Sequence, residues 1–246
     1  VASIKGVLMN LSGKRAVVTG STRGIGLAVA RSLVREGVGV MVTSRNGTEI
    51  EAAVSSLRGL GAGPVLGQVC DVRDPEQVRT LVDSCVTQLG KIDILVNNAA
   101  AVRAFKNVDV MTVEEWRTTI STNLDGVFYG CHFAVPEMKK TGGGFIINIS
   151  SLAGKNAFPG GAAYNASKFA MTGFSEALME EVRQYDIRVA YVMPGSVDTR
   201  SHSTPAEASW KMAPEDVAEV VIGTLKQHPR CLISRVEMRP SKLKKK

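Results

Sequence analysis

Short apolar runs alternate with longer amphipathic stretches along almost the whole chain. Residues 15–19 form a β-type run that ends at a glycine, and residues 24–36 then carry apolar side chains at helical spacing. The same alternation continues to the C-terminal part of the chain. It predicts further strands at residues 38–43, 65–69, 92–96, 144–149, 187–193 and 231–236, and further helices at residues 48–57, 75–89, 112–138, 163–184 and 214–227.

Strands that are apolar throughout and separated by helices indicate a parallel sheet with both faces covered. We therefore expect an α/β fold with a Rossmann-type, doubly wound parallel β-sheet in three α/β/α layers. No linker divides the sequence, so residues 1–240 are expected to form a single domain, followed by a flexible basic tail at residues 241–246. In such a fold the ligand lies past the carboxyl ends of the strands, where the strand order reverses.

The composition narrows the class of protein. The chain has 246 residues, of which 44% are hydrophobic and 22% charged, as in ordinary globular proteins. The cysteines and histidines are scattered without metal-ligand spacing, which favours buried or free thiols in a reducing compartment and no metal site. No apolar run approaches the ~20 residues of a membrane helix, and residues 1–10 lack the features of a signal peptide. A cytoplasmic protein without a membrane partner is the expectation.

The net charge of +7 depends strongly on the C-terminus. Four of the positive charges belong to Lys242, Lys244, Lys245 and Lys246, which leaves only +3 on the rest of the chain. A nucleic-acid-binding protein would need a basic stripe with aromatic side chains on the fold, and the aromatic content is only 5%. We expect no nucleic-acid partner; a loss of salt-sensitive DNA binding after deletion of the tail would reverse this expectation.

A glycine-rich loop joins the first strand to the first helix, with the pattern Thr-Gly-x-x-x-Gly-x-Gly from residue 19. Glycines at such a turn allow close backbone approach, and the helix start offers free N–H groups to a pyrophosphate. The sequence therefore predicts a dinucleotide site. Its loop residues are Gly20, Ser21, Thr22, Arg23, Gly24, Ile25 and Gly26.

The end of the second strand decides which dinucleotide is expected. Enzymes that use NAD usually place an acidic residue there for the ribose 2′-hydroxyl. This chain has Ser44 and Arg45 instead, and a guanidinium can grip a 2′-phosphate with two hydrogen bonds. Arg23 in the glycine loop can reach the same phosphate. The pattern favours NADP(H) as the cofactor.

Tyr164 and Lys168 are four residues apart at the start of a predicted helix, so they project from one face. A free tyrosine has a pKa near 10, and a cation held close is expected to lower this pKa and make the phenol a usable acid or base. The fifth strand ends thirteen residues earlier at Ser151, which places a hydroxyl at the same edge of the sheet. Residues 97–100, 123–126 and 194–199 fall at that edge or just beyond it.

Taken in order, these motifs make the chain resemble the short-chain dehydrogenase/reductase family, in its NADP-preferring form and with similarity to 3-oxoacyl reductase-like ketoreductases. The resemblance runs from about residue 11 to residue 240. It implies a catalytic tetrad of Asn123, Ser151, Tyr164 and Lys168. Tyr164 would exchange the proton with the substrate oxygen, and Ser151 would hold that oxygen. Lys168 would bind the nicotinamide ribose and lower the pKa of Tyr164, and Asn123 would position a proton-relaying water.

The resemblance also implies cofactor contacts elsewhere. Asp71 and Val72 match a pair that contacts adenine, and Val197 and Thr199 match residues that hold the carboxamide. The remaining implied contacts are Asn98, Ala99, Ala100, Tyr164, Lys168, Pro194 and Gly195. Members of the family are commonly oligomeric, so a homo-oligomer, a tetramer or a dimer, is expected through the helices around Asn123 and Tyr164.

The sequence departs from the family pattern in three places. Ala100 stands where glycine is usual, which adds a methyl group near the ribose. The stretch after Thr199, which forms the substrate lid in the family, is short and suggests an open pocket. The C-terminus lacks the glycine-rich ending of many relatives, so the subunit contacts of the last strand are not defined by the resemblance.

The favoured function is an NADP(H)-dependent oxidoreductase that reduces a ketone or aldehyde, with a 3-oxoacyl thioester among the candidates. Segments 101–105, 152–158 and 196–209 would line its pocket, with apolar side chains at Ala157, Phe158 and Trp210. The alternative is a non-catalytic NADP(H)-binding sensor or scaffold on the same fold. The complete tetrad argues against this alternative.

Overall fold

The computed structural model describes residues 8–101, 105–199, 204 and 209–242. The described residues form one sheet of seven parallel strands in the order β3-β2-β1-β4-β5-β6-β7. The order reverses between β1 and β4, as the doubly wound topology requires. The strands are β1 (Arg15–Val18), β2 (Gly39–Ser44), β3 (Val65–Val69), β4 (Ile94–Asn97), β5 (Gly144–Ile149), β6 (Ile187–Pro194) and β7 (Arg235–Met238).

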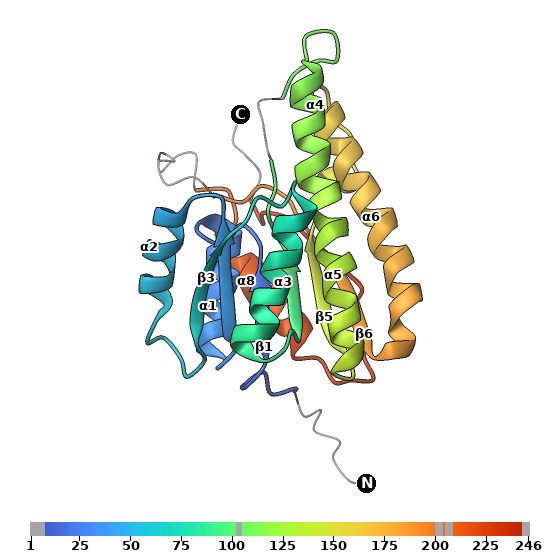
Figure 1. Cartoon of the computed structure of the whole chain (residues 1–246). Coiled ribbons are helices and arrows are strands. Elements are labelled where there is room, and N and C mark those ends of the chain that lie inside the picture. The colour runs from blue at the N-terminus through green and yellow to red at the C-terminus, as the bar shows by residue number, and fades with distance from the viewer. Residues whose placement is uncertain (1–7, 102–104, 200–203, 205–208, 243–246) are drawn as a thin grey trace.

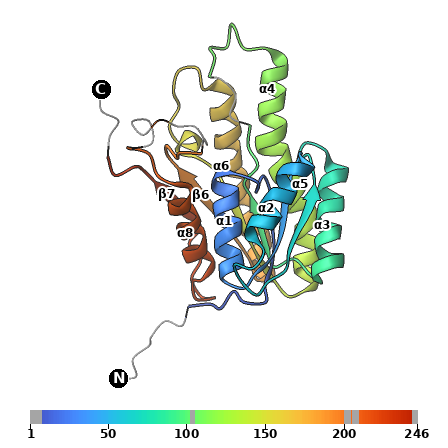
Figure 2. The same cartoon turned by 90° about the vertical axis from the view of Figure 1, so that its left-hand side faces the viewer.

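Helices cover both faces of this sheet (Figures 1 and 2). One face packs on α1 (Gly24–Arg35), α2 (Gly47–Leu57) and α8 (Pro214–Leu225). The other packs on α3 (Pro75–Leu89), α5 (Gly126–Lys140) and α6 (Ala162–Val182), and α4 (Val113–Ile120) leads into α5.

Side chains alternate between the two cores along each strand. In β1, Ala16 and Val18 pack into the core on the side of α1, α2 and α8, and Val17 packs into the core on the side of α3, α5 and α6. The three-layer α/β fold predicted from the sequence is confirmed.

Helix starts follow local sequence signals. Asp74 caps α3 by accepting hydrogen bonds from the N–H groups of Glu76 and Gln77, with Pro75 at the first helical position. Thr112 and Glu115 form a reciprocal capping box at the start of α4. These signals position the helices that flank the carboxyl edge of the sheet.

Two predicted elements differ from the structure. The last strand was expected at residues 231–236, but β7 begins at Arg235 because its pairing with β6 runs from Tyr191 opposite Arg235 to Pro194 opposite Met238. The helix expected over residues 112–138 is interrupted by a π-helical turn, η1 (Ser121–Asp125), between α4 and α5. Apolar spacing carries no signal for a π turn, because the turn shifts the helical register by only one residue.

Several expectations from composition can be compared with the described residues. Cys70, Cys85 and Cys131 are buried free thiols and Cys231 is exposed, and burial raises the pKa of each of the first three to about 12. Among the described helices, none combines the length and apolar character that a bilayer crossing requires. Residues 1–7 and 243–246 lie outside the described residues, so the N-terminal expectation and most of the basic tail have no structural counterpart.

Candidate active site

Three loops meet at the carboxyl edge of the sheet. A Cβ atom on Gly20 would lie 3.0 Å from the Cα of Ala99, so the glycine loop packs directly on the segment after β4. A Cβ atom on Gly24 would lie 3.2 Å from the Cβ of Thr199, which brings the segment after β6 to the start of α1. The topology therefore gathers the predicted cofactor segments 20–26, 98–100 and 194–199 in one place.

The structure explains why glycine occupies each of positions 20, 24 and 26 in the loop. Gly20 and Gly24 adopt left-handed backbone conformations, with φ of 63° and 53°. Gly26 has no room for a side chain, because a Cβ would lie 2.3 Å from the carbonyl oxygen of Gly20 and 2.4 Å from Nδ2 of Asn98. Helix α1 begins without a side-chain cap, so its first N–H groups are available to an anion.

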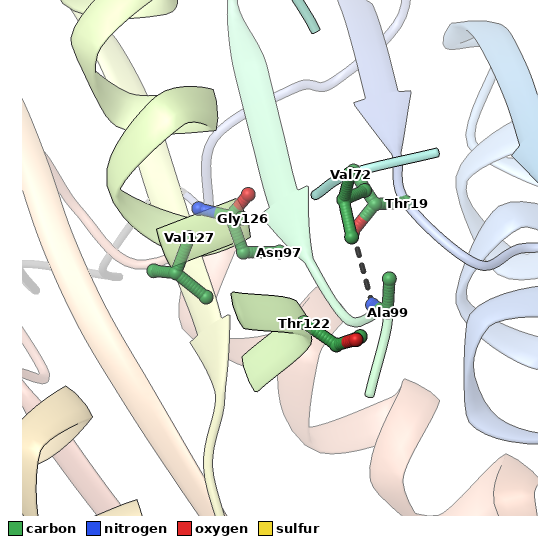
Figure 3. A pocket seen from close by; sticks show the side chains of 7 residues that line it. All are labelled: Thr19, Val72, Asn97, Ala99, Thr122, Gly126 and Val127. Atoms are coloured by element: carbon green, nitrogen blue, oxygen red, sulfur yellow. Dashed lines mark hydrogen bonds between the residues drawn. The ribbon is translucent and has the colours of Figure 1, made fainter. Parts of the chain in front are cut away.

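Thr19 and Asn98 hold the glycine loop to the end of β4. Thr19 Oγ1 accepts hydrogen bonds from the N–H groups of Asn98 and Ala99 at 2.9 and 3.0 Å, the second of which is drawn in Figure 3. Asn98 Nδ2 donates to the carbonyl oxygens of Thr19 and Gly20. The amide of Asn98 thus shapes the predicted cofactor loop, and Thr19 is a structural residue that the sequence reasoning missed.

Ser21 plays a structural part through its side chain. Its hydroxyl is fully buried, donates to the carbonyl oxygen of Val18 at 2.7 Å and accepts from the N–H of Thr43 at 2.9 Å. The side chain therefore ties β1 to β2 and points into the protein. The prediction of a cofactor contact at Ser21 can only concern its backbone.

Three further residues that were predicted to contact the cofactor, Val72, Gly195 and Val197, are held in place by neighbouring parts of the protein. Val72 is buried against Gly126 at the start of α5, where a Cβ would lie 2.9 Å from the valine methyl group, and both border the narrow recess in Figure 3. Gly195 donates its N–H to the carbonyl oxygen of Met238. Val197 pairs with Met212 in an isolated parallel bridge, so the segment after β6 is tied down at both ends.

The end of β2 carries exposed Arg45 close to Asp71. A hydrogen bond from Arg73 holds the pKa of the Asp71 carboxyl below its usual value, and Arg45 contributes to the same shift. The expected adenine-contacting carboxylate is therefore already paired with a guanidinium, at 2.5 Å from Arg73 Nη2.

An acidic side chain that the sequence reasoning missed also reaches this end of the site. Thr22 Oγ1 in the glycine loop donates to Glu49 Oε2 at 3.0 Å. Glu49 lies in the first turn of α2, four residues beyond Arg45, rather than at the strand end where an acid was sought. Its position on the first turn of the helix after β2 is the signal that could have indicated this contact.

Tyr164 and Lys168 lie one turn apart at the start of α6, as predicted. Lys168 is only 1% exposed and donates from Nζ to the carbonyl oxygen of Ile149 at 2.9 Å, at the end of β5. The same nitrogen lies 5.8 Å from the centre of the Tyr164 ring. Burial lowers the pKa of Lys168 from 10.5 to about 7.

Ser151 completes this group just beyond β5. Its Oγ accepts from the N–H of Ala153 at 3.1 Å and lies 3.4 Å from the carbonyl oxygen of Pro194, to which it donates. Burial raises the pKa of the Tyr164 phenol, and a side-chain hydrogen bond with Ser151 acts in the opposite direction. The pKa of Tyr164 is thus raised, not lowered as expected from its spacing to Lys168, and burial is the largest cause.

Asn123 lies in the π turn and is completely buried. Its Oδ1 accepts from the N–H of Ala101 at 2.7 Å, and its Nδ2 donates to the Ala101 carbonyl oxygen and to Ser167 Oγ. Ser167 donates in turn to the carbonyl oxygen of Tyr164. The side chain of Asn123 thus links the segment after β4 to the helix that carries the tyrosine. The water-positioning role implied by resemblance stays a prediction.

Ala100, where the family usually has glycine, is exposed and has no positive φ. The chain therefore accommodates the alanine without backbone strain. Of the predicted pocket, residues 102–104, 200–203 and 205–208 lie outside the described residues.

A buried chain of hydrogen bonds connects α6 to the sheet. Asn97 Nδ2 donates to Asn148 Oδ1 at 2.9 Å, and Asn148 Nδ2 donates to Ser175 Oγ at 2.9 Å. All three side chains are nearly inaccessible to solvent. The chain crosses from β4 through β5 to α6, and so it fixes the helix that holds Tyr164 and Lys168.

Replacing Asn148 with alanine is expected to destabilise the fold by about 1–3 kcal/mol, because the amide of Asn97 loses its acceptor inside the protein. Urea unfolding of the purified variant measures this free energy. Asn107→Ala, at an exposed position, is the control and should change stability by less than about 0.5 kcal/mol. Equal stability of the two variants would contradict a structural role for the chain of asparagines.

The glycine loop, the uncapped helix start and the Tyr–Lys pair at the switch point of a doubly wound sheet define a dinucleotide-binding oxidoreductase. Comparison with known proteins narrows this class. The family model for short chain dehydrogenases matches residues 14–209, and the chain belongs to that family.

Similar proteins agree with this assignment. The human dehydrogenase/reductase SDR family member 4 is 40% identical over 189 residues, which cover 77% of this chain and 68% of the human protein. An uncharacterized oxidoreductase of Staphylococcus saprophyticus is 32% identical over 95% of this chain and all of its own length. A metagenomic short-chain oxidoreductase solved in complex with NADP is 35% identical and superposes with a TM-score of 0.84, covering 95% of this chain and 100% of that one.

Proposed function

We propose that the protein is an NADP(H)-dependent reductase that transfers a hydride between nicotinamide and a small carbonyl or alcohol substrate, a ketone or an aldehyde. The observation that carries the proposal is the buried Lys168 beside Tyr164 and Ser151, at the sheet edge that also holds the glycine loop. A lysine is seldom buried without a functional reason, since burial of its charge is costly.

The residues present fit a dinucleotide phosphate. Gly26 lets the glycine loop pack tightly on the start of α1, where any Cβ would collide with Gly20 and Asn98. The uncapped start of α1 offers N–H groups to the pyrophosphate. We propose that Arg23, Ser44 and Arg45 hold the 2′-phosphate. The adenine would lie by Asp71 and Val72. The ribose and nicotinamide would contact residues 98–100, Tyr164, Lys168, Pro194, Gly195, Val197 and Thr199.

When bound, NADPH would supply the hydride for the carbonyl carbon. The phenol of Tyr164 would donate its proton to the carbonyl oxygen, and the Ser151 hydroxyl, which lowers the pKa of that phenol, would hold the same oxygen. Lys168, whose Nζ donates a hydrogen bond to the carbonyl oxygen of Ile149, would bind the ribose hydroxyl groups. Asn123 would keep the helix of Tyr164 in register with the segment after β4.

Relatives support the choice of cofactor. The metagenomic neighbour was solved with NADP. An alcohol dehydrogenase from the archaeon Thermococcus sibiricus, 26% identical with a TM-score of 0.86 over 95% of this chain and 99% of its own, was solved with 5-hydroxy-NADP. Glu49 is an acid that lies against the glycine loop, and its contact with Thr22 gives it a partner other than a ribose.

Arg45→Ala is expected to raise the KM for NADPH by about tenfold to a hundredfold, because a charged hydrogen-bonding partner of the 2′-phosphate is lost. The KM for NADH, which lacks that phosphate, should change by less than about threefold. The decrease in absorbance at varied concentrations of NADPH, and separately of NADH, measures the two KM values with a panel of ketones and aldehydes. Arg58→Ala, an exposed arginine at the other end of α2, is the matched control. A proportional loss with both cofactors would contradict the proposed phosphate site.

We also propose a homo-oligomer, a tetramer or a dimer, formed through α4, α5 and α6. These neighbouring helices present exposed aromatic side chains, with Trp116, Phe128 and Phe169 each more than 40% exposed. The ring centre of Phe128 on α5 also lies 6.3 Å from that of Phe174 on α6, so aromatic side chains of these two helices are in contact. Contiguous aromatic surface of this kind is typical of protein interfaces.

A further inference from the structure

Two phenylalanine rings, on segments that come after different strands, contact each other near the start of α6, and one of them, Phe105, also contacts the Tyr164 ring. The Phe105 ring lies 4.9 Å from the Phe158 ring, centre to centre, with an angle of 84° between their planes. It also lies 6.0 Å from the Tyr164 ring at 61°. These are edge-to-face contacts, and Phe105 is still 54% exposed. We call Phe105 and Phe158 the aromatic wall.

A pair of glycines makes room for the aromatic wall. A Cβ on Gly161 would lie 2.5 Å from the Phe158 ring, so this ring packs directly against the backbone at the start of α6. Gly160 has a φ of 76°, and a Cβ there would lie 3.5 Å from the Cβ of Phe105. The backbone just before Tyr164 thus leaves space for both rings to pack against it.

The segments that carry the two rings are anchored. Asn165, next to Tyr164, accepts from the N–H of Phe158 and donates to the carbonyl oxygens of Ala153 and Asn156. The wall therefore keeps its place relative to the phenol.

Lys106, the residue after Phe105, forms an ion pair with Glu115. Lys106 Nζ lies 2.6 Å from Glu115 Oε1 on α4, and the hydrogen bond from Lys106 lowers the pKa of Glu115 to about 2. The Glu115 carboxylate therefore stays ionised at neutral pH. The ion pair connects the segment that carries Phe105 to α4.

We propose that the aromatic wall binds an aromatic ring carried by the substrate next to its carbonyl group, so that the preferred substrates are aryl ketones or aryl aldehydes. This inference rests on the proposed function, because the position of the carbonyl is set by proton transfer from Tyr164. A ring seated on Phe105 would extend the edge-to-face row and cover its exposed surface. The ring centres of Phe105 and Tyr164 lie only 6.0 Å apart, which favours a substrate ring attached at the carbonyl or within one or two carbons of it.

The test compares two ketones of nearly equal size, acetophenone and cyclohexyl methyl ketone, with NADPH. We expect the wild-type protein to have the higher kcat/KM for acetophenone. In Phe105→Leu and Phe158→Leu, kcat/KM for acetophenone should fall about fivefold to tenfold, which corresponds to the loss of one aromatic pair. The value for the saturated ketone should fall by less than about threefold. Tyr185→Leu, an exposed aromatic at the far end of α6, is the control and should alter neither.

A second readout separates this inference from the proposed function. Saturation-transfer NMR measures the binding of 1-phenylethanol to the protein with NADP⁺, whether or not turnover occurs. Weaker binding in Phe105→Leu without any wild-type turnover would keep the ring site and refute the reductase. Turnover of both ketones at equal kcat/KM, or equal losses for both in the Phe105 and Phe158 variants, would refute the ring site and leave the reductase in place.

Discussion

Tyr164→Phe is expected to lower kcat for carbonyl reduction by about 10²- to 10⁴-fold, the usual contribution of a well-placed general acid. The phenol hydroxyl is the group that would protonate the substrate oxygen, and phenylalanine keeps the ring while removing that proton. The ring contact with Phe105 should survive, so substrate binding should change little. Single-turnover measurements with pre-bound NADPH would report the chemical step directly, and fluorescence titration would show the affinity for NADPH unchanged within about threefold.

Tyr129→Phe is the matched control, since Tyr129 is a partly buried tyrosine on α5 that packs against the core beneath α3, α5 and α6 and is not among the proposed site residues. It should retain nearly full activity. If Tyr164→Phe kept more than a tenth of the wild-type kcat, another group would be supplying the proton. If the wild-type protein bound NADPH but turned over no carbonyl compound, the sensor or scaffold alternative would become the better account.

The fold could be predicted from the sequence because its signals are local and repeated. Most strands are apolar runs, and most helices combine helical apolar spacing with a start or stop signal nearby, as at Asp74. The candidate site was predictable for a related reason. Parallel strands place the loops at their carboxyl ends along one edge of the sheet, so Ser151 and the glycine loop lie at the same edge.

The parts that escaped prediction depend on contacts between distant residues. The side chains of Asn97 and Asn148 are 51 positions apart, and either could have faced a ligand as well as each other. Glu49 reaches Thr22 across 27 positions, from the turn of a helix and not from a strand end. The inward position of Ser21 depends on Thr43 in the neighbouring strand.

The direction of the pKa shift at Tyr164 differs from the prediction because of the energetic cost of burial. A Tyr–Lys pair at helical spacing indicates a charged lysine that stabilises a phenolate, and spacing alone carries no information about burial. In the structure both groups are desolvated, so the pKa of the phenol rises and that of the ammonium falls. The energetic cost of burying Lys168 can therefore be measured as a property of the folded protein.

Lys168→Met is expected to lower kcat/KM by at least tenfold and, at neutral pH, to stabilise the fold by about 1–3 kcal/mol. Activity falls because the proposed contact with the ribose is lost. Stability rises because methionine fills the buried space without a charge, although the hydrogen bond to Ile149 is lost as well. Activity and stability should thus change in opposite directions, a result typical of a residue kept for function.

The gain in stability should depend on pH in a defined direction. The pKa of Lys168 is about 7 in the folded protein and 10.5 when the side chain is solvated. The folded state must therefore either bury a charge or give up a proton that the unfolded chain keeps. This cost is largest below pH 7, decreases as the pH rises through 7 to 10.5, and is absent above 10.5. The stability difference between Lys168→Met and wild type should shrink over the same interval.

Urea unfolding at pH 6, 7, 8 and 9 measures this dependence. Lys140→Met, whose side chain is 68% exposed, is the control and should show no such trend. Lys168→Arg adds a second comparison, because a guanidinium stays protonated throughout this range and should destabilise the fold at every pH. A difference between Lys168→Met and wild type that stays constant from pH 6 to pH 9 would mean that the pKa of Lys168 is not lowered. In that case a paired, fully charged lysine, the arrangement expected from the sequence, would be the better description of the site.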